Sequence, residues 1–106
     1  MNKTILISIA LVFSAFAQNA VSQEHEVAQK NKAFSKKQLQ IKVGDVVSFP
    51  NQDPFFHNVF SLSETKTFDL GSYKKGETKK ITFNEPGTVE VECAIHPKMT
   101  MVIEVK

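Results

Sequence analysis

The sequence predicts an all-β domain, built as a sandwich or barrel of short strands. Apolar residues alternate with polar ones in several short runs, turn-forming residues separate these runs, and no long amphipathic helix pattern follows the N-terminal segment. Many short strands at such spacing are typical of β-sandwiches and β-barrels. With 106 residues, the chain has room for one domain at most.

The N-terminal segment is predicted to be an export signal. Lys3 precedes an apolar run that is too short to span a bilayer, and Ala15-Phe16-Ala17 supplies the small residues that a signal peptidase prefers. We expect residues 1–22 to hold the signal and a short spacer, with cleavage after Ala17 or Ser22. Residues 23–106 would then form the mature domain, with no stable membrane insertion after cleavage.

The first predicted strands lie around residue 44. Apolar and polar residues alternate from Leu39 to Val43, Gly44-Asp45 indicates a turn, and Val46 to Phe49 is extended again, so this segment is predicted to be a hairpin. The next break lies at Asn51-Gln52-Asp53-Pro54, because asparagine and aspartate bond their own backbone and proline cannot donate to a ladder.

The remaining strands follow the same logic. They are predicted at residues 58–62, 67–70, 79–83 and 89–93. Gly71 is expected to end the second of these strands, and Glu85-Pro86-Gly87 matches a type II turn. One further strand is expected between Glu24 and Phe34, and we assign His25 to this exposed strand.

The charge balance argues against a nucleic-acid partner. The thirteen basic residues are all lysine and eleven residues are acidic, whereas a nucleic-acid footprint needs a strong basic stripe, usually with arginine. Lysines do gather at Lys74-Lys75 and Lys79-Lys80. Two interpretations of this cluster stay open, namely a solvated hairpin and a docking site for an acidic partner.

Four donor side chains predict a metal site. Cys93, His96 and Met99 lie within seven residues, and His57 lies upstream. Two imidazoles and one thiolate with a weak axial thioether are the ligands of blue copper sites, which transfer one electron at a time. Zinc matches less well, because structural zinc sites use four strong donors. Each donor alone would more often be a core or loop residue, so the prediction rests on their combination.

Strand parity explains how these donors can converge. Successive side chains leave opposite faces of a sheet, so the residues of the 89–93 strand divide into an apolar row ending at Cys93 and an acidic row of Glu90 and Glu92. The apolar row must be the buried one. Met99 and Met101 also face inward, but Met101 lies about 6.6 Å further along its strand. Met99 is therefore the predicted ligand, and Met101 is assigned to the core.

Residues beside His57 have more than one possible role. Asn58 is either a turn residue or a hydrogen-bond partner that ties the two ligand-bearing segments together near the sulfur. Alternation predicts that Phe55 and Phe56 point in opposite directions, with one of them near the mouth of the site.

From Leu39 to Lys106 the chain resembles the cupredoxins. Val43 to Phe49 looks like the hairpin that precedes the first ligand, and His57-Asn58-Val59 looks like the first-ligand segment. Phe83 to Cys93 looks like the approach to the thiolate, and the loop from Cys93 to Met99 has the short length found in amicyanins. Plastocyanins and pseudoazurins usually carry two more residues before the methionine.

The resemblance implies a Greek-key β-sandwich in the bacterial periplasm that holds one type 1 copper ion. It makes His57, Cys93 and His96 the trigonal ligands and Met99 the axial ligand, and it makes Asn58 a partner that supports the site. It also implies that His96 lies at the exposed end, where electrons enter and leave.

These observations together predict a soluble electron carrier. We expect it to serve redox partner proteins of unknown identity, to be monomeric, and not to be an enzyme, because the sequence offers no acid–base pair, activated nucleophile or phosphate loop. The alternative is copper trafficking or buffering, in which His96, Met99 and Met101 hand Cu(I) to another protein. A metal-free β module for adhesion or assembly is the third interpretation.

Overall fold

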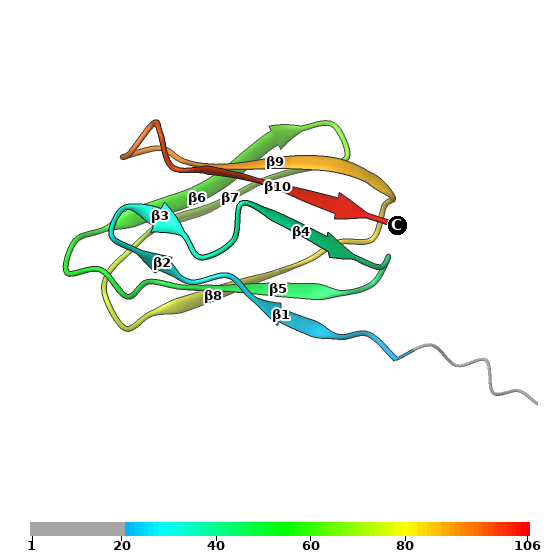
Figure 1. Ribbon diagram of the computed structural model, residues 1–106, viewed down its shortest axis with the longest axis horizontal. Helices are drawn as coiled ribbons and strands as arrows, with labels where there is room; N and C mark the ends of the chain where they lie inside the picture. Colours follow the sequence, from blue (N-terminus) through cyan, green and yellow to red (C-terminus); the bar gives the residue numbers. More distant parts are fainter. Residues whose placement is uncertain (1–20) are drawn as a thin grey trace, which may run out of the picture.

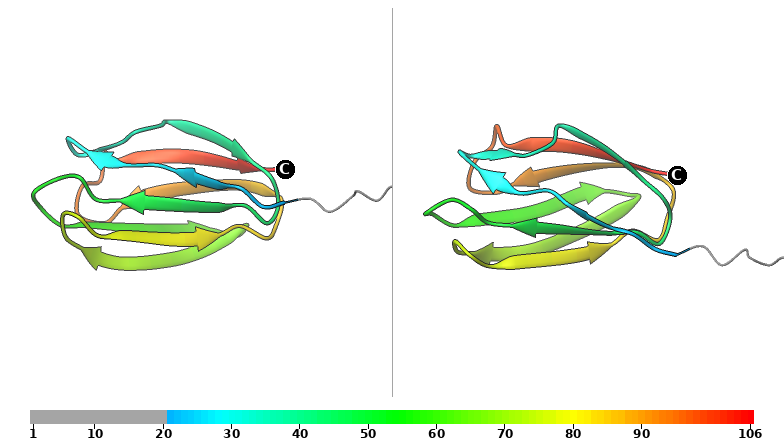
Figure 2. Two further views of the ribbon diagram at one scale, coloured as in Figure 1. Left: turned by 90° about the horizontal axis from the view of Figure 1, so that it is seen from below. Right: turned by 60° about the horizontal axis from the view of Figure 1, so that its bottom comes forward.

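The computed structural model describes residues 21–106, and the predicted export signal lies outside these residues. The described strands are β1 (Glu24–Glu26), β2 (Gln29–Lys30), β3 (Ala33–Phe34), β4 (Gln38–Ile41), β5 (Val46–Pro50), β6 (His57–Ser63), β7 (Lys66–Tyr73), β8 (Thr78–Thr82), β9 (Gly87–Cys93) and β10 (Thr100–Val105). They form a five-stranded sheet in the order β4-β10-β9-β6-β7 and a three-stranded sheet in the order β1-β5-β8 (Figures 1 and 2), while β2 and β3 pair with each other. The predicted all-β sandwich is confirmed.

The predicted hairpin over residues 39–49 is wrong. β4 pairs in parallel with β10, whereas β5 pairs with β1 and β8. The segment around Gly44, which has a φ of 95°, therefore leads the chain from one sheet to the other. Alternation locates strands but does not specify their partners. The segment between β7 and β8 is for the same reason a connection between sheets and not a hairpin.

Gly71 does not end its strand. β7 continues to Tyr73, and the register of β6 with β7 shifts between Asn58 and Phe60. Gly71, with a φ of 77°, lies in β7 opposite this irregularity, where a β-bulge requires a permissive backbone. As a result the end of β7 lies beside the start of β6, where Tyr73 pairs with His57.

The core is filled from both main sheets. Val89, Val91 and Cys93 are buried and Glu90 is exposed, so the predicted inward row of β9 is confirmed. On β10 the predicted inward position of Met101 is confirmed, and Ile103 and Val105 are buried on the same face. The segment between Glu24 and Phe34 holds three short strands in place of the single one expected.

Four connections gather at one end of the sandwich, on the left in Figure 1. They are the β2–β3 turn at residues 31–32, the β5–β6 loop at 51–56, the β7–β8 connection at 74–77 and the β9–β10 loop at 94–99. We call this end the His57 end. The other end, which we call the Gly44 end, carries the connections at 42–45, 64–65 and 83–86. Within residues 21–106, no helix is long and apolar enough to cross a membrane.

Candidate metal centre

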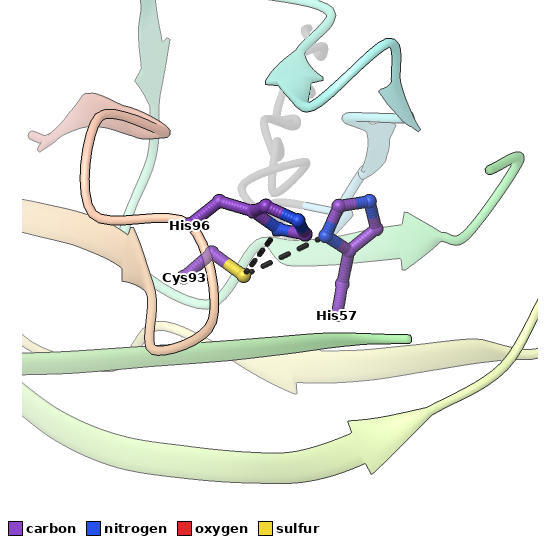
Figure 3. A group of neighbouring side chains, drawn as sticks. All are labelled: His57, Cys93 and His96. Atoms are coloured by element: carbon purple, nitrogen blue, oxygen red, sulfur yellow. Dashed lines mark hydrogen bonds between the residues drawn. The ribbon is translucent and has the colours of Figure 1, made fainter. Parts of the chain in front are cut away.

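Three donor atoms meet at the His57 end. The Sγ atom of Cys93 lies 3.5 Å from Nδ1 of His57 and 3.7 Å from Nδ1 of His96 (Figure 3). The donor atoms of these residues all lie within 4.8 Å of one another. His57 begins β6 and Cys93 ends the neighbouring β9, where it pairs with Val59, so the sheet register places the first two donors side by side.

These separations fit a shared ion. Metal–nitrogen bonds of about 2.0 Å and metal–sulfur bonds of about 2.3 Å, set at angles near 120°, place nitrogen and sulfur about 3.7 Å apart. The two observed sulfur–nitrogen distances, 3.5 and 3.7 Å, therefore match three donors around one metal ion. The donor set of two imidazoles and one thiolate is the one that blue copper sites use.

The predicted axial residue, Met99, lies in the β9–β10 loop together with His96. Met99 is 2% exposed, its N–H donates to the carbonyl of His96 at 2.9 Å, and its carbonyl accepts from the N–H of Cys93 at 3.2 Å. The loop is thus closed by its own backbone. Met101 lies within β10 opposite Val91 and is 2% exposed, which agrees with its predicted place in the core.

Burial differs between the two imidazoles. His57 is fully buried, whereas His96 is half-buried and lines a surface groove. Burial lowers the pKa of His96, and the positive charge of Lys32 lowers it further. The neutral imidazole, which is the form that binds metals, is therefore favoured at this position.

Asp53 is a site residue that the sequence analysis missed. Its Oδ2 atom lies 2.8 Å from Nε2 of His57. Because an ionised carboxylate only accepts hydrogen bonds, Nε2 carries the proton and donates, and the unprotonated Nδ1 faces Cys93. The signal in the sequence was an acidic residue four positions before the candidate ligand, inside a predicted turn.

Asp53 also joins the β2–β3 turn to the site. Its Oδ1 accepts from the N–H of Asn31 at 2.7 Å, and its Oδ2 accepts from the N–H of Lys32 at 3.0 Å. Burial by itself raises the pKa of Asp53, but the bonds from His57, Lys32 and Asn31 hold it below its usual value. The carboxylate is thus an ionised, fully engaged group beside the buried histidine.

Asn58 does tie the two ligand-bearing segments together, but through its backbone. Its N–H donates to Sγ of Cys93 at 3.5 Å, and its carbonyl accepts from the N–H of Ala94 at 3.0 Å. The side-chain amide instead donates to Asp69 on β7 at 2.8 Å. The contact near the sulfur therefore depends on the position of the backbone at residue 58 and not on the type of its side chain.

Phenylalanine 55 packs against both imidazoles. The centroid of the Phe55 ring lies 5.4 Å from that of His57 and 5.3 Å from that of His96. Phe56 is 53% exposed, so the two rings diverge as alternation predicted, and one of them borders the site. His25 lies in β1, where Nε2 is 2.9 Å from Oδ2 of Asp45, so its bond is made outside the donor cluster.

Comparison with known proteins identifies the family. The model of the copper binding proteins of the plastocyanin/azurin family matches residues 20–106. The chain belongs to this family. It is 29% identical over 106 residues to the methylamine utilization protein MauL of Methylorubrum extorquens, a match that covers 99% of this chain and 93% of the relative. It is also 32% identical over 73 residues to amicyanin of Paracoccus denitrificans, which covers 62% of this chain and 53% of amicyanin.

Solved structures of copper proteins share the fold. An oxidised amicyanin variant superimposes with a TM-score of 0.72 at 27% identity, covering 77% of this chain and 81% of amicyanin. A Cu(I) form of another amicyanin variant gives a TM-score of 0.73 at 26% identity, covering 78% and 82%. The copper-containing nitrite reductase of Thermus scotoductus gives 0.74 at 28% identity, but the match covers 88% of this chain and only 25% of the reductase.

The predicted resemblance to the cupredoxins is thereby confirmed, and so is the prediction that the cofactor is copper. The plastocyanin/azurin family binds copper. The cluster of His57, Cys93 and His96 has the donor types and the spacing that one type 1 copper ion requires.

Proposed function

We propose that this protein is a periplasmic electron carrier with one type 1 copper ion. His57, Cys93 and His96 would be the trigonal ligands, and Met99 would be the axial ligand. The observation that supports this most directly is the triangle of donor atoms around Sγ of Cys93, at 3.5 and 3.7 Å. A bound copper ion supplies the one-electron couple between Cu(I) and Cu(II).

The role of the protein is to keep its donors in place while the charge of the ion changes. The Asp53 carboxylate holds the ring of His57, and the backbone N–H of Asn58 holds the sulfur of Cys93. The backbone bonds of Met99 close the loop that carries His96. Donors that are already fixed require little rearrangement on electron transfer, which keeps the exchange fast.

His96 is the proposed point of electron entry and exit. It is the half-buried member of the donor cluster, whereas His57 and Cys93 are at most 2% exposed. Four ligands would leave no open position on the ion for a substrate, so we propose electron transfer without substrate turnover. The predicted signal at residues 1–22 supports a periplasmic location, and we propose a monomer that serves redox partner proteins.

The visible spectrum of the copper-loaded protein tests the proposal. Adding Cu(II) to the mature protein should produce an intense thiolate-to-copper band, and Cys93→Ser should abolish it. Met101→Leu is the matched control, because it alters a buried methionine that we assign to the core. A colourless wild-type complex would contradict the proposal.

Copper trafficking is the second candidate function. It is favoured by one observation, namely that His96 and Met99 both line a groove that opens to the surface. Mixing the copper-loaded protein with a copper acceptor separates the two functions. Rapid loss of metal would support delivery, whereas retention of metal with fast electron exchange would support the carrier.

A further inference from the structure

We propose that the redox partner binds the His57 end through an acidic protein surface, which exposed lysines around His96 attract and orient. This inference rests on the proposed electron-carrier function and adds the chemistry of the partner. The lysines at residues 74–80 have two interpretations, a solvated segment and a docking site for an acidic partner, and the placement of charge in the fold favours the second.

The fold brings lysines from three separate connections to the same end of the molecule. Lys32 lies in the β2–β3 turn, Lys74 and Lys75 lie between β7 and β8, and Lys98 lies in the β9–β10 loop. All four are exposed. Because β7 ends beside His57, Lys74 and Lys75 of the lysine cluster belong to the end that carries the donor atoms (Figure 1), whereas Lys79 and Lys80 lie within β8.

Acidic side chains balance these lysines only in part. The four connections of the His57 end contain two acidic residues, Asp53 and Glu77. Asp53 is buried and bonded to His57, while Glu77 accepts from the backbone N–H of Lys74. The described connections therefore give this end four lysines against two carboxylates, one of which is buried.

The Gly44 end has the opposite balance. Its three connections contain one lysine, Lys42, against Asp45, Glu64 and Glu85. The formal charge of the connections is thus +2 at the His57 end and −2 at the Gly44 end. Such a charge dipole orients an approaching acidic protein towards the positive end and accelerates productive encounters.

Two of the lysines border the surface through which electrons would pass. Lys32 and Lys98 line the same groove as His96, together with Ile95, Pro97 and Met99. Ile95 is 47% exposed. An apolar centre with a charged rim is the usual anatomy of a protein–protein interface. It suits a brief encounter, because the rim guides the partner and the small apolar area does not retain it.

A protein is the occupant that this arrangement favours. Anionic lipid would also attract lysines, but a lipid headgroup cannot accept an electron from the half-buried imidazole at the centre of the groove. Nucleic acid is disfavoured because the basic residues are all lysine and form a patch without a stripe of arginine.

Small redox reagents of opposite charge test the local field. The reduced, copper-loaded protein would be oxidised in a stopped-flow instrument by anionic ferricyanide and by cationic cobalt(III) tris(phenanthroline). At an ionic strength of about 0.01 M, where the Debye length is about 30 Å, ferricyanide should react fast and slow down as salt is added. The rate with the cationic cobalt complex should rise with salt.

Charge reversal locates the effect on the surface. The double variant Lys32→Glu/Lys98→Glu should slow ferricyanide roughly tenfold at low salt. The control variant Lys42→Glu/Lys106→Glu carries the same change in net charge at the Gly44 end, where both lysines are exposed, and should have a much smaller effect. Equal slowing by both variants, or none by either, would overturn the inference.

A polymer tests the class of partner. Poly-L-glutamate should protect the reduced wild-type protein from ferricyanide and should protect Lys32→Glu/Lys98→Glu much less. Protection by phosphatidylglycerol vesicles without protection by poly-L-glutamate would overturn the inference in favour of a membrane surface. The visible copper band, recorded on every sample, keeps this result separate from the electron-carrier proposal. If the band is intact but the oxidation rates do not depend on the charge of the reagent, only the docking inference is wrong.

Discussion

At the scale of single residues, Asp53 determines how His57 is presented to the metal. The carboxylate is 3% exposed, accepts a hydrogen bond from Nε2 of His57, and is itself held by the backbone of residues 31 and 32. A carboxylate that binds the remote nitrogen of an imidazole increases the electron donation of the other nitrogen. This favours the more highly charged state of a bound ion.

Replacing Asp53 with asparagine should therefore weaken copper binding and raise the reduction potential. We expect copper affinity to fall by about tenfold, the lower part of the range seen when such supporting groups are removed. Competition with a chelator measures the affinity, and voltammetry measures the potential. Asp45→Asn is the control, because it makes the same change at the Gly44 end. Wild-type affinity and potential in Asp53→Asn would show that the carboxylate has no such role.

The candidate metal ligands could be predicted from their residue types, but the hydrogen-bond partners that hold them in place could not. A thiolate, two imidazoles and a thioether carry their ligand character in their side-chain types, so Cys93, His57, His96 and Met99 could be proposed without coordinates. The partner of a carboxylate in a loop depends on the loop conformation, which is why Asp53 was missed. The partner of the Asn58 side chain was unpredictable for a similar reason. Its amide donates to Asp69, and these two residues are neighbours only because the register of β6 with β7 shifts at the bulge.

At the scale of elements, the start of β9 has little tolerance for a side chain. Gly87 has a φ of 138°, and a Cβ atom added there would lie 2.6 Å from Oγ1 of Thr65. Residues with a side chain rarely adopt this φ, and the Thr65 contact leaves no room for one. Since β9 runs from Gly87 to Cys93, the backbone conformation at Gly87 affects the register that positions Cys93.

Gly87→Ala should destabilise the protein by about 2 to 4 kcal/mol, combining backbone strain with the close contact. Chemical denaturation measures this free energy of unfolding. The double variant Gly87→Ala/Thr65→Ala should recover only part of the loss, because it removes the contact but keeps the strained φ; Thr65→Ala alone is the reference. Complete recovery would mean that the backbone conformation costs nothing.

Asp45 joins three elements at the Gly44 end. It accepts from the N–H of Gln23 and of Lys42, each at 3.0 Å, and from Nε2 of His25 at 2.9 Å. The bond from Gln23, followed by those from His25 and Lys42, lowers the pKa of Asp45 from 3.8 to about 2. Because the folded value lies below the unfolded one, its stabilisation is present above about pH 4 and is lost as the pH falls through about 2.

Asp45→Asn should thus be less stable than the wild type by on the order of 1 to 2 kcal/mol at pH 7. The difference should shrink as the pH falls below about 4 and should be lost only below about pH 2. Urea unfolding of the copper-free proteins across this range measures it. A difference that stays constant with pH would assign the loss to packing and not to the charge of the carboxylate.

Alternation predicted where strands lie far better than how they pair. The inward rows of β9 and β10 follow from local period and are correct. The hairpin expected over residues 39–49 is wrong, because β4 pairs with β10 while β5 pairs with β1 and β8, and none of these partners is adjacent in sequence. Strand pairing depends on the whole sheet, so it cannot be read from the local sequence pattern.

At the scale of the whole molecule, the donor cluster unites distant parts of the chain. His57 belongs to β6, whereas Cys93 and His96 belong to β9 and the loop that follows it. An unfolded chain cannot hold these three side chains together, so copper binds the folded state and shifts the unfolding equilibrium.

Copper should consequently raise the midpoint of thermal unfolding. Free copper at about a thousand times its dissociation constant contributes about 4 kcal/mol to the stability of the folded state. Differential scanning calorimetry with and without the metal measures this gain, which Cys93→Ser should lose in large part. An equal gain in Cys93→Ser would show that the ion binds elsewhere.

The burial of Cys93 protects the only thiol in the sequence. The sulfur is 2% exposed, and the ring of the fully buried His57 lies against it. Oxidants, glutathione and cysteines of other chains need direct access to attack a thiol. Burial therefore shields Cys93 from mixed disulfides and from covalent dimers with a second copy of the chain.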